Sequence, residues 1–367
     1  MIIKRSIYLI ITFLCQTMYG EESFSIFVPD KPNMQLMNLT VHASSDGISI
    51  SETTHVALPF NPSGIANHPN ESLVIVTGSN KEGAQAASVK IADGGALQLV
   101  SSSNLSHPTG YTSVDRTGRY FMAANYGTGQ ISTYNMNQDG AVGSLADSLR
   151  TPKREAHCIL TTPDNRFVYI PSVKLNNALY QYAFDETTGR LTPLEPFNAK
   201  PPAMFGPRHV AYHPNLPLLY FSNEQQLGVS LYKIGEDGLL TDRQHVPTIP
   251  RRSPFEQGKR DLHASDIALT PDGNFLFVAL RDFNGDEDSI FSFIVESEGK
   301  LSPAGRTKTG DIPWKIDTSP SGNYLITRQM GDQTLSFFKV ETDGSLKHAK
   351  TIELPAQTND FSVVGLD

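Results

Sequence analysis

One pattern recurs about six times along this chain, and its period constrains the fold more than any other feature. Each copy has a short alternating strand, a polar turn and a short apolar strand, most clearly in 206–224 and 263–281. The turns fall at intervals of 47, 47, 51, 57 and 49 residues, anchored on Pro69, Arg116, Pro163, Pro214, Pro271 and Pro320. Self-similarity at a fixed period indicates a repeat architecture.

Each unit continues with two more strands. Segments such as 229–233 and 289–293 read as a third strand, and turns such as Asp139-Gly140 and Asp343-Gly344 introduce the fourth. Asp-Gly suits such turns because Gly adopts positive φ without strain and Asp bonds its own backbone. A helical solenoid would instead show apolar residues at helical spacing. We therefore expect an all-β protein built from four-stranded propeller blades.

Two ends remain outside the six copies. Ser23–Phe27 and 38–59 read as strands without an inner strand of their own, and 360–366 reads as a lone strand. Joining these ends would complete another blade and hide two sheet edges that invite aggregation. The sequence therefore predicts a seven-bladed β-propeller over 21–367, with its last blade closed by the N- and C-terminal strands.

Residues 1–20 form a different kind of segment. Lys4 and Arg5 precede the apolar run 7–15, and Gly20 stands before the acidic Glu21. This order is typical of a secretory signal peptide. We predict that 1–20 is removed and that the protein is exported, either to a periplasm or to the medium. An uncleaved membrane anchor is the alternative.

The composition limits which classes of molecule this protein can bind. The formal net charge of −8 argues against nucleic acid and against anionic membranes, and no internal apolar stretch is long enough to span a bilayer. Removal of the signal would leave Cys158 as the sole cysteine, so we expect no internal disulfide and assign Cys158 to core packing. The chain carries no zinc-type His or Cys motif and no phosphate-binding glycine loop. We expect a monomer that uses no metal and no cofactor.

Strand order places the candidate site. The second strand of a blade runs antiparallel to the first, so the start of one and the end of the other share a rim. By this rule nine residues lie on one rim, namely Asn125, Tyr126, His157, Arg208, His209, Glu224, Arg281, Trp314 and Arg328.

The rim set is rich in arginine although the protein is acidic. An arginine fork pairs well with carboxylate or phosphate, which predicts a small anionic substrate at the channel mouth. Glu224 or His157 would act as a general base on water, and an arginine would hold the oxyanion of an attacked ester. The alternative is structural, with Glu224 neutralising Arg208 within its own blade. We expect Tyr126 and Trp314 to form walls of the site and to take no part in catalysis.

Four motifs carry a family resemblance, namely Ala156-His157, Gly206-Pro-Arg-His209, Ser222-Asn-Glu224 and Ala279-Leu-Arg281. At these residues, and from about Pro59 to the C-terminus, the sequence resembles the lactonase family of seven-bladed propellers. That family includes propeller-type 6-phosphogluconolactonase of bacteria and fungal 3-carboxy-cis,cis-muconate lactonizing enzyme. The resemblance implies that His157, Arg208, Glu224 and Arg281 form the catalytic set and that the arginines hold the acidic group of a small anionic lactone.

The chain departs from the family pattern on the same rim. Family members commonly carry Pro-Arg where this chain has Pro313-Trp314, and many carry a small or amide residue where it has Arg328. We therefore expect Trp314 and Arg328 to contact the substrate, together with His209, Asn125 and Tyr126. The resemblance favours hydrolysis of a sugar-acid type lactone, and it leaves open muconate-type cyclisation and a non-catalytic exported propeller that binds a ligand or protein.

Overall fold

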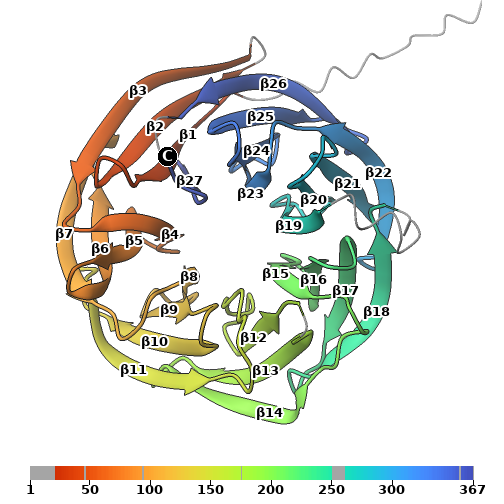
Figure 1. Ribbon diagram of the computed structural model, residues 1–367, viewed down its shortest axis with the longest axis horizontal. Coiled ribbons are helices and arrows are strands. Elements are labelled where there is room, and N and C mark those ends of the chain that lie inside the picture. The colour runs from red at the N-terminus through yellow and green to blue at the C-terminus, as the bar shows by residue number, and fades with distance from the viewer. Residues whose placement is uncertain are drawn as a thin grey trace, which may run out of the picture.

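The computed structural model describes residues 21–44, 47–92, 95–174, 176–249, 261–354 and 357–366. Its 27 strands form seven sheets arranged in a ring around a central channel (Figure 1), which confirms the seven-bladed propeller. Within these ranges no helix is long and apolar enough to cross a bilayer. The predicted signal peptide, 1–20, lies outside the described residues.

Blades one to three follow one another along the chain. Blade one contains β4 (Asn61–Asn67), β5 (Leu73–Asn80), β6 (Gly83–Ile91) and β7 (Leu97–Asn104). Blade two contains β8 (Tyr111–Val114), β9 (Tyr120–Ala124), β10 (Gln130–Met136) and β11 (Val142–Arg150). Blade three contains β12 (Phe167–Ser172), β13 (Ala178–Asp185) and β14 (Arg190–Asn198).

Blades four to seven complete the ring. Blade four contains β15 (Pro207–Tyr212), β16 (Leu218–Asn223), β17 (Gly228–Ile234) and β18 (Leu240–Pro247). Blade five contains β19 (Leu262–Leu269), β20 (Phe275–Asp282), β21 (Ser289–Val295) and β22 (Leu301–Lys308). Blade six contains β23 (Pro313–Thr318), β24 (Tyr324–Gln329), β25 (Thr334–Val340) and β26 (Leu346–Glu353). Blade seven contains β27 (Ser362–Gly365), β1 (Glu22–Asp30), β2 (Gln35–Ser44) and β3 (Gly47–Ala57).

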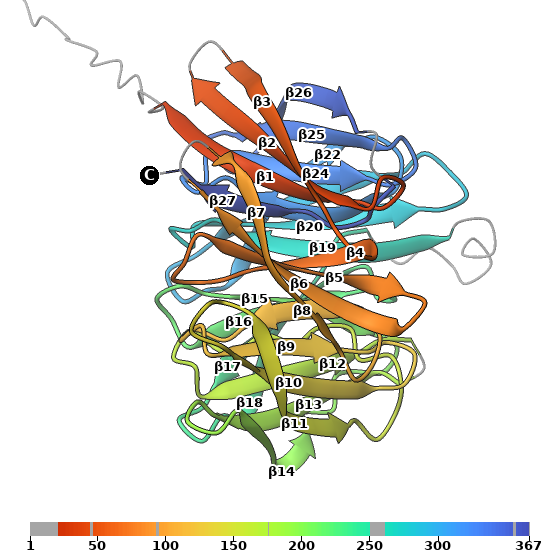
Figure 2. The same ribbon diagram turned by 90° about the vertical axis from the view of Figure 1, so that its left-hand side faces the viewer.

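The ring closes through both ends of the chain, as the orphan strands predicted. β27 pairs antiparallel with β1, so that Phe24 lies opposite Gly365 and Phe27 opposite Ser362. Figure 2 shows β27 alongside β1 at one side of the ring. The side chains of Phe24 and Phe361 are buried in one apolar cluster that also contains residues of blade six. The closing blade is therefore held by strand pairing and by packing.

Blade three departs from the expected four strands. The repeat predicts a short alternating strand at the start of every blade, but among the described residues the segment around His157 pairs with β12 only through two isolated bridges, Ala156 with Ser172 and Thr161 with Val168. The carbonyl of Pro171 accepts the His157 amide at 2.9 Å. Proline has no N–H, so the reciprocal ladder bond cannot form. His157 therefore lies on irregular backbone.

Neighbouring blades interlock at the glycine turns. Gly238, in the turn between β17 and β18, has φ of 80°, and a Cβ there would lie 2.2 Å from the ring of Phe167 in blade three. The Tyr169 hydroxyl donates to the Gly238 carbonyl at 2.7 Å, and Tyr220 donates to Gly299 of the next blade at the same distance. The turns that Asp-Gly predicts thus also connect one blade to the next.

Several inner strands contain β-bulges that change the direction of side chains near the centre of the ring. Strands β15, β19 and β23 each shift register against their neighbour, between Pro207 and Val210, Ala264 and Ile267, and Pro313 and Lys315. A bulge re-aims side chains that would alternate in a regular strand. This is why consecutive residues such as Arg208 and His209 both reach the site described below.

Candidate functional site

The predicted catalytic set lies around one cavity, here called the rim cavity. It has a volume of about 410 Å³ and is lined by Gly110, Tyr126, Ala156, His157, Lys174, Arg208, Glu224, His263, Arg281, Phe283 and Trp314. Blade four supplies Arg208 from the start of β15 and Glu224 from just after β16. Blade five supplies Arg281 from near the end of β20, and blade three supplies His157 from the irregular segment before β12. The structure brings these four side chains together, while their catalytic roles remain predictions.

Two buried guanidinium groups share one carboxylate in this cavity. Arg208 and Arg281 are 1% and 3% exposed. Glu224 Oε2 lies 3.0 Å from Arg208 Nε and 3.5 Å from Arg281 Nη2. Neither arginine Nε has a hydrogen-bond partner among the described residues, because even the close contact of Arg208 is poorly aligned. The arginines therefore carry more positive charge and more donors than Glu224 can satisfy, which suits a bound anion.

Aromatic rings hold the two guanidinium groups in place. The Arg281 guanidinium carbon lies 4.4 Å from the centre of the Trp314 ring and 5.4 Å from that of Phe283. Arg208 lies 5.6 Å from the same Trp314 ring. A cation over an aromatic face is attracted by the ring quadrupole. Trp314 therefore contacts both arginines and lines the cavity, which gives the predicted wall residue an additional role in orienting charge.

Two ionisable residues that the sequence did not predict also line the rim cavity. Lys174 follows β12, and its ammonium lies 5.6 Å from the centre of the Tyr126 ring. His263, near the start of β19, lies 3.5 Å from Glu224 Oε1 and 2.7 Å from Asp261 Oδ1. The contact with Glu224, followed by that with Asp261, raises the pKa of His263. Both residues obey the strand-end rule, so the rule applied to every blade would have found them.

Glu224 is held in its ionised form. Burial alone would raise the pKa of Glu224, but His263, Arg208 and Arg281 together lower it far below its ordinary value. A carboxylate stabilised in this way is a weak proton acceptor at neutral pH. Its evident contribution is to balance part of the charge of the two arginines.

A second cavity, here called the channel cavity, lies on the other side of His157. Its volume is about 240 Å³, and it is lined by Ser63, Gly64, Ile65, Thr77, Thr109, Gly110, Tyr111, Thr112, His157, Arg208, His209, Trp314, Lys315, Asn359 and Asp360. His157, Arg208 and Trp314 line both cavities. Gly110 also lines both, so these four residues lie between the rim cavity and the channel cavity.

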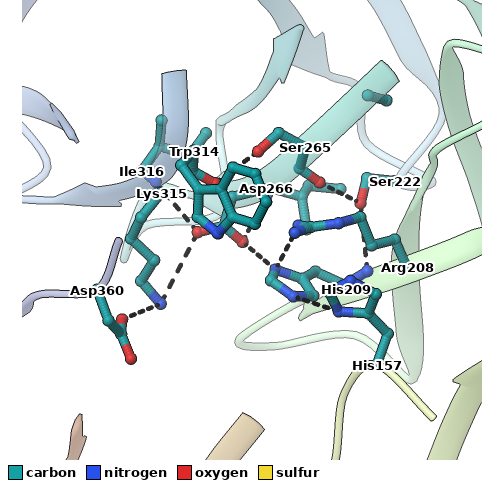
Figure 3. Close-up of polar contacts among 12 residues, drawn as sticks. His157, Arg208, His209, Ser222, Ser265, Asp266, Trp314, Lys315, Ile316 and Asp360 are labelled. Carbon is teal, nitrogen blue, oxygen red and sulfur yellow. Dashed lines mark hydrogen bonds and ion pairs between the residues drawn. The ribbon is translucent and has the colours of Figure 1, made fainter. Parts of the chain in front are cut away.

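A chain of polar contacts extends from His157 into the protein (Figure 3). His157 Nδ1 lies 3.1 Å from His209 Nε2, and His209 Nδ1 lies 2.7 Å from Asp266 Oδ1. Lys315 Nζ lies 3.8 Å from both Asp266 and Asp360. His209, predicted to bind substrate, therefore lies beneath His157 and lines the channel cavity.

Two predicted substrate contacts line neither cavity. Asn125 donates to the Pro108 carbonyl at 2.8 Å and accepts from the Thr128 amide, which fixes the turn after β9. Arg328 donates to the carbonyls of Thr358 and Thr334 at 2.9 and 3.1 Å. The strand-end rule locates both residues at the ends of second strands, but it does not give the direction of their side chains. In the described part of the chain no cluster of His, Cys, Asp or Glu is arranged to hold a metal ion.

Comparison with known sequences identifies the family. The family described as "Lactonase, 7-bladed beta-propeller" matches residues 33–359. The 6-phosphogluconolactonase of Yersinia pestis (strain Pestoides F) is 26% identical over 315 residues, which cover 84% of this chain and 89% of that protein. The 6-phosphogluconolactonase of Cronobacter sakazakii is 27% identical over 238 residues, covering 64% of this chain and 68% of that protein.

Solved structures agree with the fold. The periplasmic gluconolactonase of Pseudomonas aeruginosa superposes with a TM-score of 0.79 at 20% identity, covering 94% of this chain and all (100%) of that one. A protein from Lactobacillus plantarum superposes with a TM-score of 0.78 at 20% identity, covering 93% and 99%. Since the family match spans nearly all seven blades, the chain belongs to the lactonase family of seven-bladed β-propellers.

Proposed function

We propose that this protein hydrolyses a small lactone of the sugar-acid type that carries a carboxylate or phosphate group. The observation that carries the proposal is the charge around the rim cavity, where Lys174, Arg208 and Arg281 face one carboxylate, Glu224. The cavity volume, about 410 Å³, suits a small molecule. Relatives named 6-phosphogluconolactonase support a lactone as the substrate.

The arrangement supports a simple reaction course. The anionic group of the substrate would lie against Arg281 and Lys174, with the lactone carbonyl toward Arg208. A water molecule gives one proton to a general base while its oxygen bonds to the carbonyl carbon. Arg208 stabilises the resulting oxyanion. The ring C–O bond then breaks, the ring oxygen takes the proton back from the base, and the product is a hydroxy acid.

We also propose that the protein works outside the cytoplasm. Two observations support this location. Residues 1–20 have the pattern of a secretory signal, and the structural neighbour from Pseudomonas aeruginosa is a periplasmic gluconolactonase. Fractionation of the source cells, with N-terminal sequencing of the exported material, tests both export and cleavage. Recovery of the protein in the cytosol with Met1 retained would contradict the proposal.

A panel of lactones tests the activity. The purified protein is mixed with carboxylated, phosphorylated and neutral lactones of similar ring size, and acid release is followed with a pH indicator. We expect kcat/KM for an anionic lactone to exceed that of its neutral counterpart by at least roughly tenfold, the effect of one charge-assisted contact. Equal or faster turnover of neutral lactones would refute the anion site. Binding of anionic lactones without turnover would establish the non-catalytic alternative.

A further inference from the structure

Asp266 is built as a permanent anion beneath the site. It is 4% exposed, in the bulged inner strand of blade five. The amides of Ile267 and Ile316 donate to its two oxygens at 2.9 and 3.1 Å, and Lys315 lies 3.8 Å away. Burial alone would raise the pKa of Asp266, but Lys315, His209 and Arg208 together lower it well below its ordinary value. Asp266 can therefore only accept hydrogen bonds.

This anion determines which nitrogen of His209 carries the proton. Burial, followed by Arg208, lowers the pKa of His209 to about 4, so the ring is neutral and has one N–H. The contact of 2.7 Å between His209 Nδ1 and Asp266 requires that proton on Nδ1. Arg208 Nη1 also lies 3.3 Å from His209 Nδ1, but a guanidinium N–H and an imidazole N–H are both donors and cannot bond to each other. The shorter contact, to the carboxylate of Asp266, therefore determines that Nδ1 carries the proton. His209 Nε2 is therefore an acceptor.

His209 in turn determines which nitrogen of His157 carries the proton. Its Nδ1 lies 3.1 Å from His209 Nε2, so Nδ1 must donate. Burial, Arg208 and His209 lower the pKa of His157 well below its ordinary value, so this ring too is neutral and has one proton. His157 Nε2 is then unprotonated, and among the described residues none hydrogen-bonds it. His157 lines both cavities, where a water or substrate can reach it.

We infer that Asp266 and His209 are positioning residues that hold His157 protonated on Nδ1, so that His157 Nε2 is the base that takes the proton from water. The role as a base rests on the proposed lactone hydrolysis, whereas the tautomer does not. When Nε2 takes the proton, the new positive charge lies near Arg208, and the negative charge of Asp266 offsets it through His209. Breakage of the ring C–O bond returns the proton to the ring oxygen.

Other charged and titratable groups around the two imidazoles come from several blades. They are Arg208, Glu224, Tyr126, Tyr111, Asp266 and Lys315. Arg208 opposes protonation of His157, and Glu224 favours it. Both oxygens of Glu224 are occupied by cationic neighbours, whereas His157 Nε2 has no hydrogen-bond partner among the described residues, so His157 is the group placed to receive the proton.

Nuclear magnetic resonance tests the tautomer directly. Two-bond proton–nitrogen correlations of the ¹⁵N-labelled full chain report which ring nitrogen carries the proton. We expect His157 to be protonated on Nδ1 in the wild type. In Asp266→Asn the new amide can donate to His209 Nδ1, which moves the His209 proton to Nε2 and the His157 proton to its own Nε2. The matched control is Asp242→Asn, which alters another Asp–His pair, 2.6 Å from His245 on β18.

Kinetics on an anionic lactone then test the role as a base. We expect Asp266→Asn to lower kcat roughly a hundredfold or more while KM changes by less than about threefold. Asp242→Asn should leave both constants unchanged. His209→Gln offers Oε1 as an acceptor for His157 Nδ1–H and should keep kcat within roughly tenfold of the wild type, whereas His209→Phe should lose roughly a hundredfold.

The outcomes separate this inference from the proposed function. A wild-type His157 protonated on Nε2 would overturn the inference, and so would Asp266→Asn with an unchanged tautomer and kcat. Equal losses in His209→Gln and His209→Phe, with matching losses of thermal stability, would show a purely structural role and would also overturn it. The expected tautomer in a protein that hydrolyses no lactone would support the assignment of the protons and refute only the lactonase activity.

Discussion

Arg281 offers a direct test of anion binding at the scale of a single residue. Its guanidinium lines the rim cavity and contacts Glu224 and Trp314. Losing one charge-assisted hydrogen bond costs about 1.5–3 kcal/mol, so Arg281→Ala should raise KM for an anionic lactone roughly tenfold to a hundredfold. Arg281→Lys keeps the charge but not the planar fork, so its KM should lie between those of the wild type and Arg281→Ala. Steady-state kinetics decide, and an unchanged KM in Arg281→Ala would remove this residue from the anion site.

His209 makes stability depend on pH in a defined direction. Its pKa is about 4 in the folded protein, below its ordinary value of 6.5. Between these values the unfolded chain binds a proton that the folded chain does not, so the free energy of unfolding falls as pH is lowered, by up to about 3 kcal/mol. Urea unfolding at about pH 7 and about pH 4.5 should show a smaller loss in His209→Gln, which has no titrating group there. Equal losses would mean that His209 is not held neutral.

The sequence predicts part of the site because strand order determines the rim. Arg208, Glu224 and Arg281 lie at strand ends, and His157 lies where the repeat predicts the inner strand of blade three to begin, so the order of the strands brings them together. Asp266 lies inside an inner strand, at a bulge that turns its side chain toward His209. No residue pattern in the sequence predicts this bulge. The sequence also does not give the direction of a side chain at a strand end, as Arg328 shows.

At the scale of elements, the tyrosine contacts between blades are testable. Tyr220 OH donates to the buried Gly299 carbonyl of the next blade. In Tyr220→Phe that carbonyl loses its partner, and an unsatisfied buried group costs about 1–3 kcal/mol. The equivalent position in blade five already carries Phe277, which is fully buried, so the repeat accepts this ring. Urea unfolding measures the loss, and unchanged stability would show that the hydroxyl contact contributes nothing.

Local chemistry explains which elements were predictable. Asp-Gly turns were recognised because glycine is needed at positive φ, as at Gly140, Gly238 and Gly344. The repeat predicts a regular inner strand in blade three, but Pro171 on the paired segment has no N–H and interrupts the ladder there. A proline removes a hydrogen bond from the strand paired with its own. Its effect therefore falls on a residue that is distant in the sequence, as here on His157.

Closure of the whole ring depends on a short C-terminal segment. Phe361 is 1% exposed, and Asp360 accepts from the Ile65 amide of blade one at 3.1 Å. Removing 357–367 should lower the free energy of unfolding by more than about 3 kcal/mol, since burial of Phe361 alone contributes about 1.5–3 kcal/mol. The open edge of β1 should also promote self-association. Thermal unfolding and gel filtration measure both effects, with removal of Asp367 alone as the control. A monomer of unchanged stability would contradict the closure.

Blade number was predictable at this scale because unpaired sheet edges are unfavourable. Six copies and two orphan ends left one arrangement that pairs the two ends in a seventh blade, and the structure adopts it. The two cavities were not predictable, because their volumes depend on how side chains from several blades pack across the channel.

The pairing of β1 with β27 also sets the order of events during synthesis. Phe24 lies opposite Gly365, so its partner strand leaves the ribosome roughly 340 residues later. At about 5–20 residues per second this delay is roughly twenty seconds to a minute. Throughout that time one edge of β1 has no partner, whichever of the other blades have already formed. That edge is therefore open to pairing with neighbouring chains until translation reaches β27.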